Sequence, residues 1–189
     1  MAIIRITTPS IADDAIDNTK LDLGDDYTFT GTIEGAGGGI FESQLLHVRD
    51  EKSTDTDGGS YTADTDNTRD LNTVLTNEIT GASLSSNQIT LPSGTYYIQA
   101  SAPAFNVNRH RILLQNTTDS SLVLLGTSEF IAPGRDITTR AFLFGRFTIS
   151  AQKVFEIRHY IKNTGGNLGV DTIDGRNEVY TDVKIWKVA

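Results

Sequence analysis

Along the second half of the chain, hydrophobic residues recur at alternate positions in short runs that are separated by turn residues. Alternation with a period of two predicts half-buried β-strands. About eight segments fit this pattern, and no amphipathic helical pattern lies between them. The clearest are residues 88–91, 95–100, 110–116, 121–130, 140–150, 153–162 and 178–188. Because a parallel sheet would need crossover helices, we expect an all-β antiparallel sandwich or barrel.

The predicted strand over residues 140–150 is apolar on both faces around Phe142, Leu143 and Phe144. A strand of this kind is buried on both faces. One face can pack on the opposite sheet, so the other needs a neighbouring subunit, and we expect self-association. In the strand over residues 153–162, His159 lies on the apolar face, which suits a core or an interface position. The residues predicted at the subunit interface are Arg140, Phe142, Phe144 and His159.

The first 39 residues lack the alternating pattern. One short apolar stretch, Ile3–Ile6, is followed by Asp, Asn and Gly residues, which disfavour both helix and strand. The run GAGGG at residues 35–39 reads as a hinge. We therefore divide the chain into an extended arm (1–39), ordered only against a partner, and a body (40–189); an ordinary disordered terminus is the alternative. The arm residues proposed to contact a partner are Ile11, Ile16, Leu21, Tyr27 and Phe29.

Composition narrows the class of protein. The chain has 189 residues, 38% of them hydrophobic, and no cysteine. This length predicts one compact body with a core of its own. The lack of cysteine excludes disulfides, thiolate zinc sites, iron–sulfur clusters and a cysteine nucleophile. No run of eighteen apolar residues occurs, so we expect no membrane insertion, and the first residues are too weakly apolar for a secretory signal.

The net charge of −8 is unevenly distributed. Residues 1–70 carry 15 acidic and 5 basic residues, whereas residues 71–189 carry 9 acidic and 11 basic residues. The negative charge therefore belongs to the arm and a polar loop, and the rest of the body is nearly neutral. Its arginines alternate with apolar residues instead of forming a stripe, which favours salt bridges over a nucleic-acid surface.

Candidate chemistry is sparse. His47, His110 and His159 are not at metal-ligand spacing, and the chain has no G-x-S-x-G, P-loop or G-x-G-x-x-G motif. We expect no cofactor and no enzymatic activity; a glycosidase with paired carboxylates is the weaker alternative. The acidic loop over residues 55–66 suits either solvent or Ca²⁺, which prefers oxygen ligands. The candidate ligands are Asp55, Asp57, Asp64 and Asp66.

Several strings in the body resemble the C-terminal domains of tailed-phage fibre and virion proteins. These are R-x-LNT (69–73), L-PSGTYYI-ASAPA (91–104), N-RHR-LL (108–114) and the terminal V-IWK. The resemblance covers about residues 68–187. It implies a C1q/TNF-like jelly-roll β-sandwich that forms homotrimers, with ten short strands in two sheets and the C-terminal strand inside the sandwich.

The front of the chain is similar to strings that phage fibres carry near their virion-attached ends. TTPSIADDAIDNTKL and YTFTGTIEG each occur once, without the long shaft that most fibres insert. The resemblance implies a virion protein on the tail or capsid surface, either a short tail fibre that binds the host or a capsid-decorating trimer. The implied partners are further copies of the chain, other virion proteins, and a host-surface glycan or receptor.

Overall fold

The computed structural model describes residues 44–132, 134–163 and 165–188, and these residues form twelve β-strands without any helix. The strands are β1 (Gln44–Lys52), β2 (Thr65–Thr68), β3 (Thr73–Asn77), β4 (Ser83–Ser85), β5 (Gln88–Leu91), β6 (Gly94–Phe105), β7 (Arg109–Asn116), β8 (Ser121–Leu125), β9 (Glu129–Phe130), β10 (Thr138–Ile149), β11 (Lys153–Ile161) and β12 (Glu178–Lys187). This part of the chain accordingly offers no helix long and apolar enough to span a membrane.

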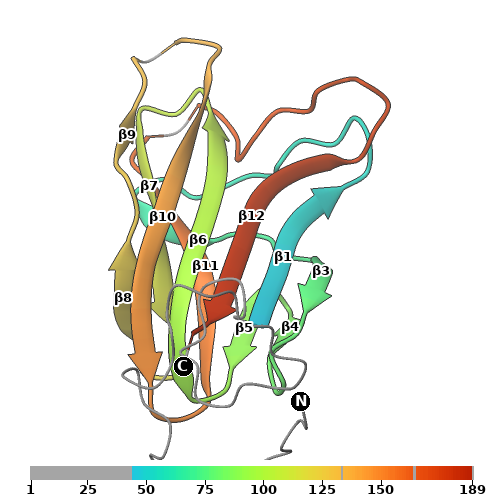
Figure 1. Ribbon diagram of the computed structural model, residues 1–189. Coiled ribbons are helices and arrows are strands. Elements are labelled where there is room, and N and C mark those ends of the chain that lie inside the picture. The colour runs from blue at the N-terminus through green and yellow to red at the C-terminus, as the bar shows by residue number, and fades with distance from the viewer. Residues whose placement is uncertain (1–43, 133, 164, 189) are drawn as a thin grey trace, which may run out of the picture. The chain divides into compact units, whose positions relative to one another are not determined.

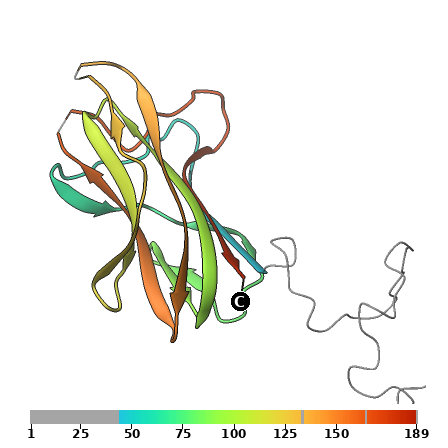
Figure 2. The same ribbon diagram turned by 60° about the vertical axis from the view of Figure 1, so that its left-hand side comes forward.

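The strands form two sheets that face each other as layers (Figures 1 and 2). The five-stranded sheet has the order β10-β6-β12-β1-β3. The seven-stranded sheet has the order β4-β5-β11-β7-β8, with β2 beside β11 and β9 beside β7. Every strand pair is antiparallel, and the C-terminal strand β12 lies between β6 and β1. The predicted antiparallel sandwich is therefore confirmed, and the last strand is central to it.

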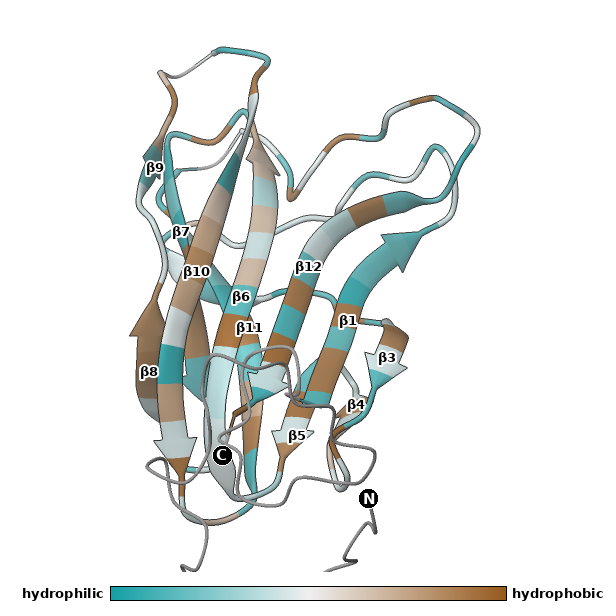
Figure 3. Ribbon diagram, viewed as in Figure 1, coloured by the Kyte–Doolittle hydropathy of each residue, from teal (hydrophilic) through white to brown (hydrophobic). Residues whose placement is uncertain are grey.

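The core lies between the sheets and follows the alternation seen in the sequence (Figure 3). On β11, Phe155, Ile157, His159 and Ile161 are fully buried, as their shared face predicted. The largest contributions to the main cluster come from bulky side chains of both sheets, among them Leu46, Ile89, Leu91, Tyr96, Ile98, Ile112, Leu114, Leu143, Phe155, Ile157, Val183 and Ile185. Burial of this apolar surface is the main driving force for folding.

Two short corners and one bridging segment are among the connections between the layers. The Pro92-Ser93 turn passes the chain from β5 in one sheet to β6 in the other, and Ala151-Gln152 does the same between β10 and β11. Between β8 and β9, the Gly126 N–H donates to the Ile112 carbonyl at 2.8 Å and the Thr127 N–H donates to the Phe142 carbonyl at 2.7 Å. The segment thus bonds to both sheets and meets the edge of β10 at Phe142.

The first and the last strand residues of the body lie side by side. Gln44 at the start of β1 pairs with Lys187 at the end of β12. The loops between β9 and β10 and between β11 and β12 lie at the opposite end of the strands (Figure 1). The segment that precedes residue 44 consequently joins the body at the end remote from these loops.

Candidate functional site

The outward face of the five-stranded sheet carries four aromatic side chains, which we call the aromatic strip: Phe142 and Phe144 of β10, Tyr97 of β6 and Trp186 of β12. Phe142 and Phe144 stack with ring centroids 6.0 Å apart and remain 39% and 49% exposed. The Tyr97 and Trp186 rings lie opposite each other in the strand register, 5.9 Å apart. Because Ala141 and Leu143 point into the core, pleating forces both phenylalanines outward.

Polar side chains border the aromatic strip on the same face. Arg140 donates to the Ser101 hydroxyl at 3.0 Å and to the Tyr180 carbonyl at 2.8 Å, so it ties β10 to β6 and β12. Asp182 pairs with His47 at 2.8 Å and with Lys184 at 2.7 Å. Burial alone would raise the pKa of the Asp182 carboxyl, but the hydrogen bonds and charges of these two partners outweigh burial and lower that pKa below its usual range. An apolar centre with a satisfied polar rim is the arrangement of a protein–protein interface.

The strip combines predicted and unpredicted residues. Phe142, Phe144 and Arg140 lie on one outward face, as an interface would require, and their role there stays a prediction. The sequence pattern does not single out Tyr97 and Trp186 for this face. The register that places them opposite each other, and on the same face as Phe144, depends on the order of strands in the sheet.

The prediction that His159 lies at a subunit interface is wrong. Its side chain is completely buried between the two sheets, so it offers no surface to another subunit. His159 Nε2 lies 2.8 Å from His110 Nδ1, and His110 Nε2 lies 2.7 Å from the Thr139 hydroxyl. The apolar face of β11 that suggested an interface is the face that covers the core.

A buried arginine lies close to these histidines. Arg69, which is fully buried, donates to the Thr181 hydroxyl at 2.8 Å and to the Leu168 carbonyl at 3.1 and 3.2 Å. Burial lowers the pKa of the Arg69 guanidinium to about 10. Arg69 therefore stays charged and fastens the loop before β12 to β12 itself. Sequence reasoning missed this role, because nothing in the polar segment around Arg69 indicates burial.

Asp50 is a second buried charged residue. Its carboxylate is fully buried and has one close cation, Lys52, at 3.2 Å. Burial outweighs this attraction and raises the pKa of the Asp50 carboxyl. Lys52 compensates the buried charge only in part, because neither Asp50 oxygen has a hydrogen-bond partner among the described residues.

The four candidate calcium ligands do not come together. The Asp57 carboxylate accepts from the Asn167 side chain and the Asp171 backbone, whereas Asp64 accepts from Tyr160 and Lys162 on β11 and just beyond it. No three acidic or histidine side chains of the described residues are grouped so that they could hold a metal ion. Asp57 and Asp64 instead tie the acidic loop to the body.

The predicted attachment residues Ile11, Ile16, Leu21, Tyr27 and Phe29 lie outside the described residues, as does the whole of the predicted arm. Their role rests on the sequence alone. It stays a prediction.

Comparison with known proteins identifies the fold. No family model and no curated protein matches the sequence. Among solved structures, the globular domain of a zebrafish complement 1qA protein matches at a TM-score of 0.51 and 12% identity, covering 78% of this chain and 98% of that one.

Two further structures agree with this match. Eiger TNF from S. frugiperda aligns at a TM-score of 0.55 and 11% identity, over 78% of this chain and 93% of its own. Murine APRIL aligns at 0.52 and 9% identity, over 77% and 99%. Identities this low show the fold and nothing finer. The described part of the chain is thus a jelly-roll β-sandwich of the C1q and TNF type.

Proposed function

We propose that the protein is a homotrimeric, non-enzymatic virion protein, a short tail fibre attached to the particle by residues 1–39, with its jelly roll presented to the host. The observation that carries self-association is the aromatic strip. Phe142, Phe144 and Tyr97 are large apolar side chains gathered on one face of the sheet and exposed in a single chain. Contiguous patches of this kind on soluble proteins mark interaction surfaces.

The trimeric state is the one that resemblance to C1q/TNF-like jelly rolls implies. The virion setting is supported by the fibre-like strings quoted above, from TTPSIADDAIDNTKL to the terminal V-IWK. Three arms on one trimer would gain avidity for the particle without any new kind of contact. The loops at the end remote from residue 44 would then be the parts most accessible to a host surface (Figure 1).

Analytical ultracentrifugation of the full chain tests the proposal. We expect a single species with three times the 20.6 kDa mass of one chain. A stable monomer at micromolar concentration would remove the basis of the proposal, because the aromatic strip would then have no partner.

A capsid-decorating trimer is the second candidate. It is favoured by one feature: the attachment-like strings precede the body directly, without a shaft. Copy number separates the two roles. Tens of trimers or fewer, located at the tail, indicate a fibre, whereas hundreds spread over the shell indicate decoration. Incubation with host surface polysaccharide tests the glycan-cleaving alternative, and we expect no release of reducing ends.

A further inference from the structure

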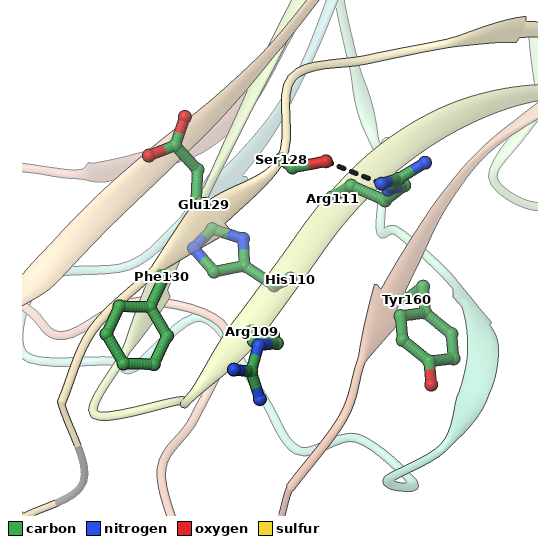
Figure 4. Close-up of a pocket in the computed structure, with 7 residues that line it drawn as sticks. All are labelled: Arg109, His110, Arg111, Ser128, Glu129, Phe130 and Tyr160. Carbon is green, nitrogen blue, oxygen red and sulfur yellow. Dashed lines mark hydrogen bonds between the residues drawn. The ribbon is translucent and has the colours of Figure 1, made fainter.

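The outward face of the seven-stranded sheet contains a groove of about 250 Å³ beside β7 (Figure 4). Arg109 and Arg111 are two positions apart on β7, so pleating places both on this face, with His110 between them pointing inward. Tyr160 of β11 forms one wall, and Ser128 and Phe130 from β9 and the segment before it form the other. The groove lies towards the end of the body remote from residue 44.

The two arginines of the groove make no ion pair with any described residue, unlike their neighbours on the same face. Arg158 pairs with Glu156 at 3.0 Å and Lys162 with Asp64 at 2.7 Å. Arg109 instead lies over the Phe130 ring, 5.2 Å from its centroid, and Arg111 donates to the Ser128 hydroxyl.

Glu129 also lines the groove, but it does not neutralise the arginines. Its carboxylate accepts from the Thr127 hydroxyl at 3.1 Å, and in Figure 4 it points away from Arg109 and Arg111. Arg109 also donates to the Asn108 side-chain carbonyl at 3.3 Å. The two guanidinium groups, held by an aromatic ring, an amide oxygen and a hydroxyl, keep most of their donors for a ligand. Arginine is the side chain best suited to bind a carboxylate through two parallel hydrogen bonds.

A second hollow of about 380 Å³ continues the groove and shares Arg111 and Tyr160 with it. Its wall carries the aliphatic side chains of Leu113, Leu122 and Leu125, and its polar groups are those of Asp66 and Gln115. The Asp66 carboxylate can accept hydrogen bonds from hydroxyl groups of a ligand, and it repels a negatively charged group in this hollow. The hollow therefore suits a neutral, hydroxyl-bearing group with an apolar face, which describes a sugar ring.

We propose that this surface binds an acidic saccharide, with one sugar carboxylate held between Arg109 and Arg111. Tyr160 and the leucines would pack against the sugar faces, and Asp66 and Gln115 would bond hydroxyl groups. A nucleic acid or polyphosphate fits less well, because Arg109 and Arg111 are the only arginine or lysine residues among the described residues that line the two hollows, and Asp66 lies beside them. The inference deepens the proposed host-binding role, on which it rests, by naming the class of ligand.

Binding of a matched pair of sugars to the full chain provides the test. Methyl β-glucuronide and methyl β-glucoside differ only in the carboxylate, and each is titrated while protein amide NMR signals are followed. We expect the glucuronide to shift signals of β7 and β11 and to bind roughly tenfold or more tightly than the glucoside. Arg109→Gln with Arg111→Gln should weaken glucuronide binding by a similar factor. Arg176→Gln, which changes an exposed loop arginine, should not.

Further measurements separate the alternatives. Arg111→Lys keeps the charge but removes the planar fork, so its affinity should lie between those of the unchanged protein and the double variant. Unchanged thermal unfolding shows that the variants remain folded. Equal binding of the two sugars, equally tight binding of inorganic phosphate, or loss of binding in Arg176→Gln would each overturn the proposal.

Burial of Arg109 and Arg111 against another subunit, seen as solvent protection of β7 in the oligomer, would also overturn it. Sedimentation as a trimer is measured separately. A failed sugar titration with an intact trimer therefore contradicts this inference alone, whereas a monomer contradicts the proposed function.

Discussion

At the scale of single residues, the interior of the sandwich holds an unusual set of polar groups. His110 and His159 contact each other through ring nitrogens, and His159 Nδ1 has no partner among the described residues. If His159 Nε2–H donates to His110 Nδ1 and His110 Nε2–H donates to the Thr139 hydroxyl, the ring atom left without a partner is an acceptor, His159 Nδ1. The reverse tautomers would leave a buried N–H there, which costs more, and either arrangement requires both rings to be neutral.

Acidification should therefore destabilise the body through these histidines. Burial, together with the Arg69 charge, lowers the pKa of His110 from 6.5 to about 4, and the same causes lower the pKa of His159. The unfolded chain then binds more protons than the folded one, so stability is complete above about pH 6.5 and declines as the pH falls towards 4. For His110 alone we expect a loss of about 2 kcal/mol between pH 8 and pH 5, measured by urea unfolding.

His159→Gln provides the comparison for this pH dependence. The variant retains Asp50, whose raised pKa makes acidification favour the folded state. A smaller loss of stability between pH 8 and pH 5 in the variant would therefore measure the contribution of the buried histidines. His47→Gln, which changes a partly exposed histidine on the sheet face, should keep most of the loss. If NMR shows the His159 ring titrating near pH 6.5 in the folded protein, the buried neutral pair is contradicted.

At the scale of elements, β10 is the strand whose inward face, edge and outward face each have a different role. Its inward residues fill the core, its edge bonds to Thr127 at Phe142, and its outward face holds Phe142 and Phe144. The bonds at Phe142 oppose pairing of a further strand at that position, and the exposed side chains of β10 are available for contact with another subunit. We therefore expect Phe142 and Phe144 to form the contact of β10 with another subunit.

Replacing both phenylalanines should dissociate the oligomer without unfolding the subunit. For Phe142→Ser with Phe144→Ser we expect the dissociation constant to rise roughly tenfold or more, since each ring loses its burial at the interface. Sedimentation at several concentrations measures this change, and circular dichroism checks the fold.

The matched control for this experiment removes exposed apolar side chains from the other sheet. Leu122→Ser with Leu125→Ser changes two exposed leucines of β8 in the other sheet and should leave sedimentation unchanged. An unchanged oligomer in the phenylalanine variant would show that the aromatic strip is not the subunit contact.

Strands with strong alternation were predictable from sequence, and strands defined by pairing were not. Residues 153–162 and 178–188 carry their own signal, and β11 and β12 occupy nearly these ranges. In contrast, β2 (Thr65–Thr68) and β4 (Ser83–Ser85) are polar, short and largely exposed. They are strands only because β11 and β5 supply hydrogen-bond partners, which is non-local information.

The same distinction explains the candidate site. Phe142 and Phe144 could be found because a strand apolar on both faces needs two partners. The burial of His159 inside one subunit, and the gathering of Arg109, Arg111 and Tyr160 around one groove, depend on which strands become neighbours. A sequence periodicity assigns a residue to a face but does not say what covers that face.

At the scale of the whole molecule, the topology separates two ends of the body. The Gln44–Lys187 pair brings the N-terminal connection and the last strand to one end, and the long loops lie at the other (Figure 1). The groove with Arg109 lies towards the loop end, where β7 begins and pairs with β9. A protein attached through the segment before residue 44 would hold this end outward, as a host-binding role requires.

Removing the arm should therefore separate assembly of the trimer from attachment to the particle. The twelve described strands span residues 44–187, and their core cluster is built from residues 46–185. We expect the truncated chain to fold and to sediment as the full chain does, yet to be absent from purified particles. Quantitative immunoblotting of particles made with either chain measures incorporation.

Point changes within the arm test the attachment more finely than the deletion. If its apolar side chains bind the particle, Ile11→Ser, Ile16→Ser and Leu21→Ser together should lower incorporation by roughly tenfold or more, because each buried aliphatic side chain contributes about 1.5–3 kcal/mol. Thr19→Ser removes one methyl group from the same stretch and should have little effect. Normal incorporation of the truncated chain would mean that the jelly roll itself binds the particle, and its outward orientation would then have to be reversed.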